Sequence, residues 1–419
     1  MHSEEDKKPG ISYKIKNQIL WAIAVILFIY LIYFVVVNAG KETHGFASYY
    51  TASKLLLSGE NVSMFYNDDW FSERVKEFVP GVYEIYHVNP PVTCLITIPF
   101  AIFNYSTAKI FWTIINLLVL ALTTRFLLTW LKFDKQRSLL TIIVILCFQP
   151  LYANVFYGQI YLLIFCLLIF AGSAYSSGND KLLGIILGFI IVIKLAGLIL
   201  LVLLVVQKKW RSIVWTFITI LTLVVISFSF VGIESWFVYA DSLMKYFSSP
   251  TLSVTAYQTV HSFFYHLTVF DQQWNPQPLI NLPLLGKVLT YLSTIVVLGA
   301  VCYFANKIKN ANLTFGIFII AGIILSPASV DYHYIIILIP LMIFIKNFYP
   351  VESKWIHLGL IMVYVLIAAA IPYTSPKVTG GFLSVFAYPK LYGAIGLLVL
   401  LFFNASELFQ KQKNISGHN

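Results

Sequence analysis

Long apolar segments alternate with short polar segments along the whole 419-residue chain. Apolar runs of 18 or more residues recur, and that length lets an α-helix cross the hydrocarbon core of a bilayer. Because a helix satisfies its own backbone hydrogen bonds in lipid, the pattern predicts an all-α polytopic membrane protein with about 12 transmembrane helices. The predicted spans are 19–38, 89–104, 107–130, 138–153, 159–175, 182–206, 212–231, 285–305, 312–328, 334–346, 356–372 and 390–405.

The first apolar run, ILWAIAVILFIYLIYFVVV, follows a basic N-terminus and precedes no small-residue cleavage site. We expect a retained first helix rather than a signal peptide, whose apolar region would be shorter. Composition agrees, since 59% of the residues are apolar and 11% are charged, whereas soluble domains carry about a quarter charged residues. No internal repeat is visible, so we treat residues 1–419 as a single transmembrane domain.

Basic loops set the expected orientation, because short loops rich in lysine and arginine stay in the cytoplasm. Both ends of the chain and three turns are basic; the turns are 207–211, 306–310 and 346–355. An even number of spans places them on one side, so we predict an integral protein of the inner or plasma membrane with both termini cytoplasmic. The basic loop 132–137 falls outside in this scheme. If that loop is cytoplasmic, either 89–104 or 138–158 is re-entrant.

Two long loops, 39–88 and 232–284, then lie on the outer face, where loops on a rigid scaffold commonly carry function. Residues 45–58 have helical periodicity and are expected to form a helix in the membrane interface, with tyrosine hydroxyls at the headgroups. Its apolar face is formed by Phe46, Tyr49, Tyr50 and Leu57. A second helix is expected to begin near NDDW, and its cap candidates are Asn67, Asp68 and Asp69.

Charge and motif content exclude several other classes of function. The net charge of +10 comes from lysines scattered through loops, which suits anionic membrane lipids and gives no nucleic-acid patch. The four cysteines lie in apolar runs and the histidines are dispersed, so neither a disulfide framework nor a metal site is expected. The sequence contains no Walker-type or Gly-x-Gly-x-x-Gly phosphate loop, so we expect no nucleotide and no other cofactor.

Six segments stand in a consistent order over about residues 20–345. They are GFASYYTASKLLLSG, NPPVTCLITIPFAIFN, FYGQIYLLIFCLLIFAG, LLGIILGFIIVIKLAGLILLVLLVVQKKWRS, YQTVHSFFYHL and LSPASVDYHYIIILIPL. Their order and spacing together resemble glycosyltransferase family 87, whose members are polyprenol-phosphate-mannose-dependent membrane mannosyltransferases with a C-type glycosyltransferase fold.

The resemblance implies a hexosyltransferase that moves a hexose, here mannose, from a polyprenyl-phosphate donor to a lipid-linked or surface-glycan acceptor on the outer face. Such enzymes typically use a carboxylate of the first outer loop as general base. The family often has an acid immediately before the Phe-x-x-Tyr-Tyr run, and the matching position in this chain is Gly45. The catalytic carboxylate therefore cannot be carried over to this position.

Titratable residues of the first outer loop are candidates for the base that takes the acceptor proton. Asp68 and Asp69 are adjacent, and a helix cap requires only one of them. A histidine titrates near about pH 6.5, so His44 can itself accept a proton, the alternative being an exposed loop histidine. We predict His44, Asp68 and Asp69 as the catalytic residues, with Glu42 as the next candidate.

Five residues are predicted to bind the donor. Lys194 lies near the centre of an apolar run, where a charge costs at least about 2.5 kcal/mol, so we expect it to bind the phosphate rather than to snorkel to the surface. By resemblance, His333 and Tyr334 match the last two residues of a His-His-Tyr run that would bind phosphate, with Tyr332 in place of the first histidine and packing in an aromatic interface cluster as the alternative. Gln258 and His261 align with a polar Asn-Gln motif of the second outer loop, in which Tyr257 replaces the Asn.

Two other functions are compatible with the sequence. One is a lipid or oligosaccharide transporter or flippase, which paired discontinuous helices in symmetric halves would favour. The other is a glycan ligase or polymerase that uses a different lipid-linked sugar. The long outer loops with amphipathic helices favour the glycosyltransferase over the transporter.

Overall fold

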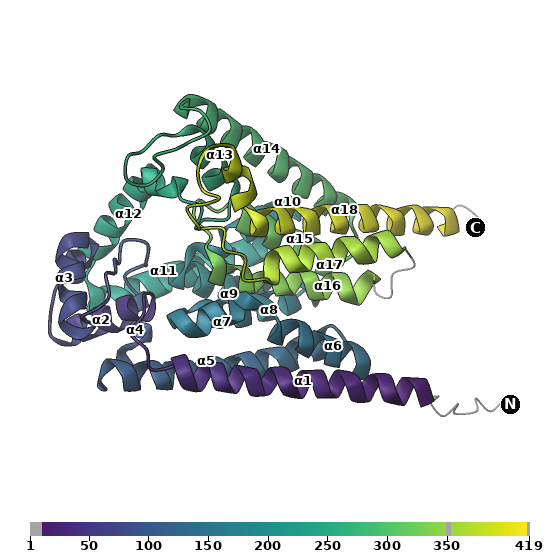
Figure 1. Ribbon diagram of the computed structural model, residues 1–419, viewed down its shortest axis with the longest axis horizontal. Helices are drawn as coiled ribbons and strands as arrows, with labels where there is room; N and C mark the ends of the chain where they lie inside the picture. Colours follow the sequence, from purple (N-terminus) through teal and green to yellow (C-terminus); the bar gives the residue numbers. More distant parts are fainter. Residues whose placement is uncertain (1–10, 349–352, 417–419) are drawn as a thin grey trace.

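The long helices of the computed structural model run side by side, and the first and last helices have their outer ends at one end of the bundle (Figure 1). The structure describes residues 11–348 and 353–416, which contain helices and no β-strand. The N-terminal residues up to 10, and residues 349–352 of the basic turn 346–355, lie outside this range. Short helices of the two long loops gather at the opposite end of the bundle.

The helices of the bundle are α1 (Ile11–Asn38), α5 (Tyr105–Trp130), α6 (Lys135–Leu146), α7 (Gln149–Tyr157), α8 (Tyr161–Ser176), α9 (Asp180–Ile193), α10 (Leu198–Val206), α11 (Trp210–Val231), α14 (Pro283–Lys307), α15 (Ala311–Leu325), α16 (Leu338–Phe348), α17 (Lys354–Ala368) and α18 (Pro389–Ser416). The shorter helices are α2 (Phe46–Leu57), η1 (Val62–Tyr66), α3 (Asp68–Phe78), α4 (Thr93–Ile96), η2 (Ile98–Phe100), η3 (Leu195–Gly197), α12 (Glu234–Phe247), η4 (Pro250–Ser253), α13 (Val260–Thr268), η5 (Asp331–Ile337) and η6 (Gly381–Ala387).

Within the described residues, five helices are long and apolar enough to cross a membrane, or up to seven if each of two bent helix pairs forms one span. The bent pairs are α6 with α7 and η6 with α18, and each bends by 52°. A multispan helical architecture is therefore confirmed, whereas the predicted total of about twelve spans is not.

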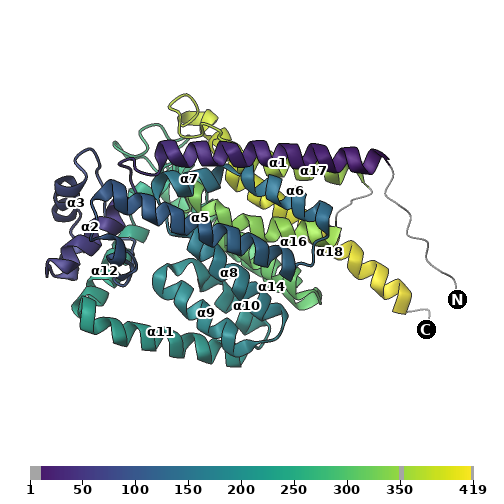
Figure 2. The same ribbon diagram turned by 90° about the horizontal axis from the view of Figure 1, so that it is seen from below.

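The predicted span 89–104 is wrong. Prolines interrupt this segment, which forms only the short helices α4 and η2 before α5 begins. α5 then returns beside α1 (Figure 2). At its far end the ammonium of Lys346 donates to the carbonyl oxygen of Lys132 at 3.3 Å. The basic loop 132–137 therefore shares a side of the molecule with the basic turn 346–355, against the scheme that placed it on the other side.

The predicted span 182–206 is also wrong, because the chain turns back at its centre. α9 ends one residue before Lys194, which adopts an extended conformation with φ −154° and ψ 140°, and η3 and α10 follow. The far ends of the two helices meet, since the Lys209 ammonium lies 3.0 Å from the carboxylate of Asp180. α9 and α10 are therefore two half-length helices with Lys194 at the apex between them.

With these two corrections, the other basic loops stay on the side of the membrane that the sequence predicts. Losing one span and turning another into a re-entrant pair lowers the number of crossings by two and keeps it even. The start of α1 and the end of α18 accordingly lie at the same end of the molecule (Figure 1, Figure 2). The corrected path also removes the conflict over loop 132–137, since the basic loops now share one side.

The helix predicted at 45–58 forms as α2, but it is buried in protein instead of lying in the interface. Phe46, Tyr49 and Tyr50 are each at most 3% exposed. The Tyr50 hydroxyl donates to a backbone carbonyl oxygen at 2.8 Å, and the Phe46 ring stacks on Trp112 of α5. Burying aromatic rings with their hydroxyls satisfied anchors the first long loop on the bundle.

A lysine that the sequence analysis did not single out reinforces this anchor. Lys109 of α5 is fully buried and donates to the Lys41 carbonyl at 2.6 Å, to Thr43 Oγ1 at 2.7 Å and to the Phe156 carbonyl at 2.8 Å. A buried ammonium is tolerated when such partners replace water. Lys109 therefore fixes the segment before α2 against the end of α7.

Candidate active site

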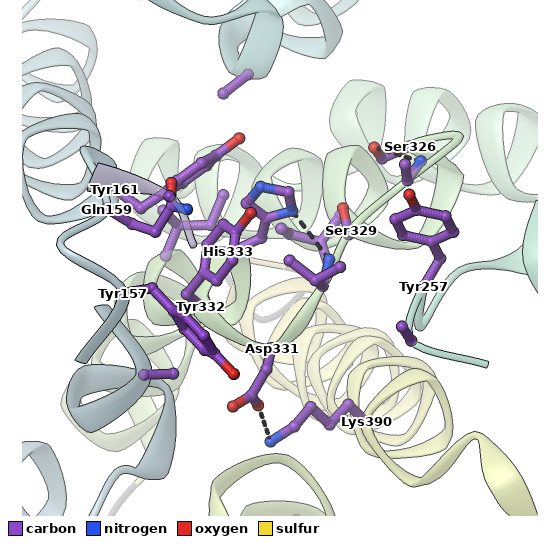
Figure 3. Close-up of a pocket in the computed structure, with 18 of the residues that line it drawn as sticks. Tyr157, Gln159, Tyr161, Tyr257, Ser326, Ser329, Asp331, Tyr332, His333 and Lys390 are labelled. Atoms are coloured by element: carbon purple, nitrogen blue, oxygen red, sulfur yellow. Dashed lines mark hydrogen bonds and ion pairs between the residues drawn. The ribbon is translucent and has the colours of Figure 1, made fainter. Parts of the chain in front are cut away.

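A cavity of about 1560 Å³ opens where the first long loop, α7, η3, η5 and the start of α18 come together. Its polar wall combines segments far apart in the chain. In Figure 3, Tyr157, Gln159 and Tyr161 from the α7–α8 region face Tyr332 and His333 from η5. This convergence of polar side chains in a cavity of this size makes it the candidate active site.

Lys194 lines this cavity from the apex between α9 and η3. Its ammonium donates to Asn89 Oδ1 at 2.6 Å and lies 5.8 Å from the centre of the Tyr49 ring. An ammonium carries three N–H donors. After the bond to Asn89, two of them have no partner among the described residues, so they can receive an anion.

His333 lies on η5 with its ring against Tyr161, at 4.1 Å between ring centroids. Its Nδ1 accepts a hydrogen bond from the backbone N–H of Val330 at 3.0 Å (Figure 3). A neutral imidazole that accepts at Nδ1 carries its proton on Nε2. His333 therefore contributes an N–H donor to the cavity wall.

An ion pair forms another part of the wall. Lys390 Nζ lies 2.7 Å from Asp331 Oδ1 (Figure 3) and also donates to the Ile367 carbonyl oxygen at 2.6 Å. Lys390 is only 1% exposed, so its charge depends on these partners. The pair adds polar groups to the cavity without adding net charge.

Gly45 caps α2 with φ +84°, a conformation that favours glycine. A Cβ at this position would lie 2.3 Å from Gln159 Nε2 and 2.6 Å from the Tyr157 carbonyl oxygen. Gln159 is fixed there because its Oε1 accepts from the Tyr49 hydroxyl at 2.9 Å. The space that an acidic side chain at position 45 would need is therefore filled.

Glu84 instead places a carboxylate beside Gly45. Its Oε2 accepts from the Gly45 N–H at 2.5 Å, and its Oε1 accepts from the Ile85 N–H at 3.1 Å. Glu84 lines the same cavity as Lys194. The sequence analysis passed over it, because nothing in the stretch GVYEIYH distinguishes it from an ordinary loop acid.

Of the residues predicted as catalytic, His44 lines the cavity, whereas Asp68 and Asp69 do not. Neither aspartate caps α3, because Asn67 Oδ1 accepts the hydrogen bond from the first turn at 3.1 Å. Asp68 lies 2.9 Å from Nδ1 of His87, which does line the cavity, and Asp69 is exposed. Asp68 therefore reaches the site only through His87.

Gln258 and Tyr334 lie behind the cavity wall. Gln258 is fully buried, and its side-chain amide makes hydrogen bonds of 2.7–3.1 Å with three backbone groups. The Tyr334 hydroxyl donates to the Gln258 carbonyl oxygen at 2.5 Å. These hydrogen bonds are all to protein groups. Gln258 and Tyr334 therefore hold together the loops that form the wall.

His261 faces a separate, smaller cavity of about 420 Å³ beside α14. Its ring lies 4.1 Å from that of Tyr265, and burial lowers the pKa of His261 to about 4. Of the five residues predicted to bind the donor, Lys194 and His333 line the candidate active site.

The chain matches the family model of glycosyltransferase family 87 over residues 86–327, which is more than half of its length. The chain belongs to glycosyltransferase family 87. No curated protein and no solved structure matches it. Within the matched range lie Asn89, Gln159 and Lys194 of the cavity, while Gly45 and His333 lie outside it.

Two parts of the cavity wall of this membrane glycosyltransferase are apolar. One is formed by η3, α10 and α15. Gly322 lets α15 approach α10 closely, since a Cβ at this position would lie 2.7 Å from Ile199 Cγ2. Apolar lining also comes from Phe34 of α1 and from residues 368–371 at and after the end of α17. Apolar walls beside a polar centre suit substrates that carry lipid chains.

The sequence analysis missed several polar residues of the enzyme's cavity, namely Glu84, Asn89, Gln159, Asp331 and Lys390. A usable signal existed for two of them, because Asp331 and Lys390 are lone charges beside long apolar runs. No group of three or more His, Cys, Asp or Glu side chains within the described ranges could hold a metal ion.

Proposed function

We propose that this glycosyltransferase moves a hexose, mannose by family resemblance, from a polyprenyl-phosphate donor to a lipid-linked or surface-glycan acceptor. The observation that carries the proposal is Lys194, whose ammonium has two unpartnered donors and opens on a cavity with apolar walls. A phosphate attached to a lipid chain has both features that this site would recognise, an anion and an apolar tail.

The chemistry assigns a role to each group. The bond between sugar C1 and the phosphate oxygen breaks, and its electron pair stays on the phosphate while the acceptor oxygen bonds to C1. Lys194 stabilises the charge that grows on the leaving phosphate, and His333 adds an N–H donor. The prenyl chain then lies along α10 and α15, which continue the wall from Lys194.

The proposal places the reaction at the outer face, with both termini in the cytoplasm. The basic loops that share one end of the bundle support this orientation. The cavity lies toward the two long loops, and it is lined by residues of both, such as His44 and Tyr257.

Membranes that contain the protein, incubated with radiolabelled polyprenyl-phosphate mannose and then extracted, test the proposal. The expected result is a new labelled product that forms with the wild-type chain and is absent from membranes lacking it. Label that crosses the bilayer on its original carrier would favour a flippase. Transfer from another polyprenyl-phosphate hexose, but not from the mannose donor, would correct the sugar.

A further inference from the structure

Two carboxylates line the cavity within the described part of the chain, those of Glu84 and Asp331. Asp331 is paired with Lys390 at 2.7 Å, so its charge is already neutralised. Glu84 forms no ion pair among the described residues, and its oxygens accept two backbone N–H groups. Because a carboxylate offers about four acceptor positions, Glu84 keeps capacity to accept a hydrogen bond from a hydroxyl.

Glu84 and Lys194 contact neighbouring turns of α2. The Glu84 carboxylate bonds to the N–H of Gly45, and the Lys194 ammonium lies over the ring of Tyr49. These two positions are four residues apart, which is about one helical turn or roughly 5–6 Å. Gln159 contacts the same two positions, through its bond to Tyr49 and its close approach to Gly45. Glu84 and Lys194 therefore both lie beside the first turn of α2 and line the same cavity.

Tyr49 is not a candidate for the base. Burial raises the pKa of Tyr49 well above its usual value, so its hydroxyl stays protonated. That hydroxyl donates to Gln159 at 2.9 Å. Glu84 is the carboxylate that contacts this end of α2.

We propose that Glu84 is the general base of the glycosyl transfer, an assignment that rests on the proposed function. As the acceptor oxygen bonds to sugar C1, its proton moves to the Glu84 carboxylate. The C1–phosphate bond breaks, and its electron pair stays on the phosphate beside Lys194. Glu84 thus supplies from the end of the first long loop the carboxylate that position 45 cannot carry, since Gln159 fills that space.

Glu84→Gln separates catalysis from the structural contacts of this side chain. The Gln side-chain oxygen can still accept one backbone N–H, but the variant cannot take a proton. Removing a general base lowers kcat by about 10²–10⁴-fold, while binding of polyprenyl phosphate should be unchanged and the melting temperature should fall by no more than the loss of one backbone hydrogen bond explains. Glu73→Gln is the matched control, because Glu73 is an exposed carboxylate of the same loop, with a side chain 72% exposed and paired to Lys76.

The measurement is transfer of label from polyprenyl-phosphate mannose by the full-length protein, with polyprenyl phosphate binding measured in parallel. Wild-type turnover in Glu84→Gln would overturn the assignment and leave the proposed function intact. A wild-type chain that transfers no label would refute the proposed function, and the role of Glu84 would fall with it.

If Glu84→Gln lowers the melting temperature, the pair Glu84→Asp and Glu84→Asn decides the question. Both shorten the side chain equally and weaken the contact with Gly45, but only Asp keeps a carboxylate. The Asp variant should turn over at least about tenfold faster than the Asn variant. Equal rates in these two variants would overturn the assignment.

Discussion

Lys194→Met is the most direct test of the phosphate site. Methionine keeps an unbranched apolar side chain but removes the ammonium, which donates to Asn89 at 2.6 Å and has two further N–H donors without partners among the described residues. The donor phosphate therefore loses up to two charge-assisted hydrogen bonds. The substitution also removes the hydrogen bond that Asn89 Oδ1 accepts from Lys194.

The size of the effect follows from these contacts. A hydrogen bond to a charged group contributes about 1.5–3 kcal/mol, and about 1.4 kcal/mol corresponds to a factor of ten. Two such bonds predict a fall in kcat/KM of about 10²–10⁴-fold. Stability should change little, because the unpaired Asn89 oxygen costs about 1–3 kcal/mol and removing a charge from low-dielectric surroundings offsets that cost.

Label transfer and thermal unfolding of the same preparations provide the measurement, with Lys109→Met as the contrasting variant. Lys109 donates all three of its N–H groups to protein acceptors, so its loss removes three buried hydrogen bonds, leaves the Lys41 carbonyl oxygen unpaired and should lower the melting temperature. We expect Lys194→Met to lose activity at nearly constant stability, and Lys109→Met to lose stability. A wild-type kcat/KM in Lys194→Met would show that Lys194 only supports Asn89, and the phosphate site would be refuted.

Three further predictions address the loop, the path of the chain and the second cavity. Gly45→Asp places a Cβ 2.3 Å from a neighbouring amide nitrogen, so the melting temperature should fall; an unchanged value would show that the loop has room for an acid. Single cysteines at 134 and 346 should be labelled from one face of the membrane and a cysteine at 60 from the other; labelling of 134 together with 60 would refute the corrected path. Burial holds the pKa of His261 at about 4 in the folded protein, against about 6.5 when unfolded. The unfolded state therefore binds more protons between these values, so stability is fully present above pH 6.5 and declines as the pH falls towards 4. His261→Phe should flatten this decline in melting temperature, and equal slopes in both proteins would contradict the assignment.

Local sequence patterns predicted the helical elements well, because each depends on the periodicity of its own residues. The helix at 45–58 and the helix after Asn67 both form within a residue or two of the expected positions. The sequence of a helix says less about whether lipid, water or protein surrounds it. The aromatic face of 45–58 suits a membrane interface and a protein interior equally, and only tertiary contacts such as Phe46 with Trp112 decide between them.

The path through the membrane was mispredicted where length alone was ambiguous. The run 182–206 is long enough for one span, but it also suits two half-length helices joined at Lys194, and the contact between Asp180 and Lys209 that closes this arrangement is tertiary. In 89–104 a local signal existed, since the prolines at 90, 91 and 99 argue against a continuous helix.

The residues of the candidate site also differ in whether the local sequence marks them. Lys194 was predicted because a lone charge in an apolar run is costly and stands out in the sequence. Glu84 was missed because its position matters only through its contact with Gly45, 39 residues away, which no local pattern records.

The cavity forms where helices of the bundle are interrupted. α6 bends by 52° into α7, Lys194 separates α9 from η3, and residues 326–330 separate α15 from η5. Each interruption contributes residues to the cavity wall. Unpaired backbone groups are costly in lipid, so irregular segments at membrane depth persist where protein buries them or where they line a polar cavity. An uninterrupted helix over 182–206 would carry its polar residue through the bilayer without bringing it to Asn89. The re-entrant path and the position of Lys194 in the cavity therefore have one physical cause, because the turn that shortens α9 and α10 also brings Lys194 to the cavity wall.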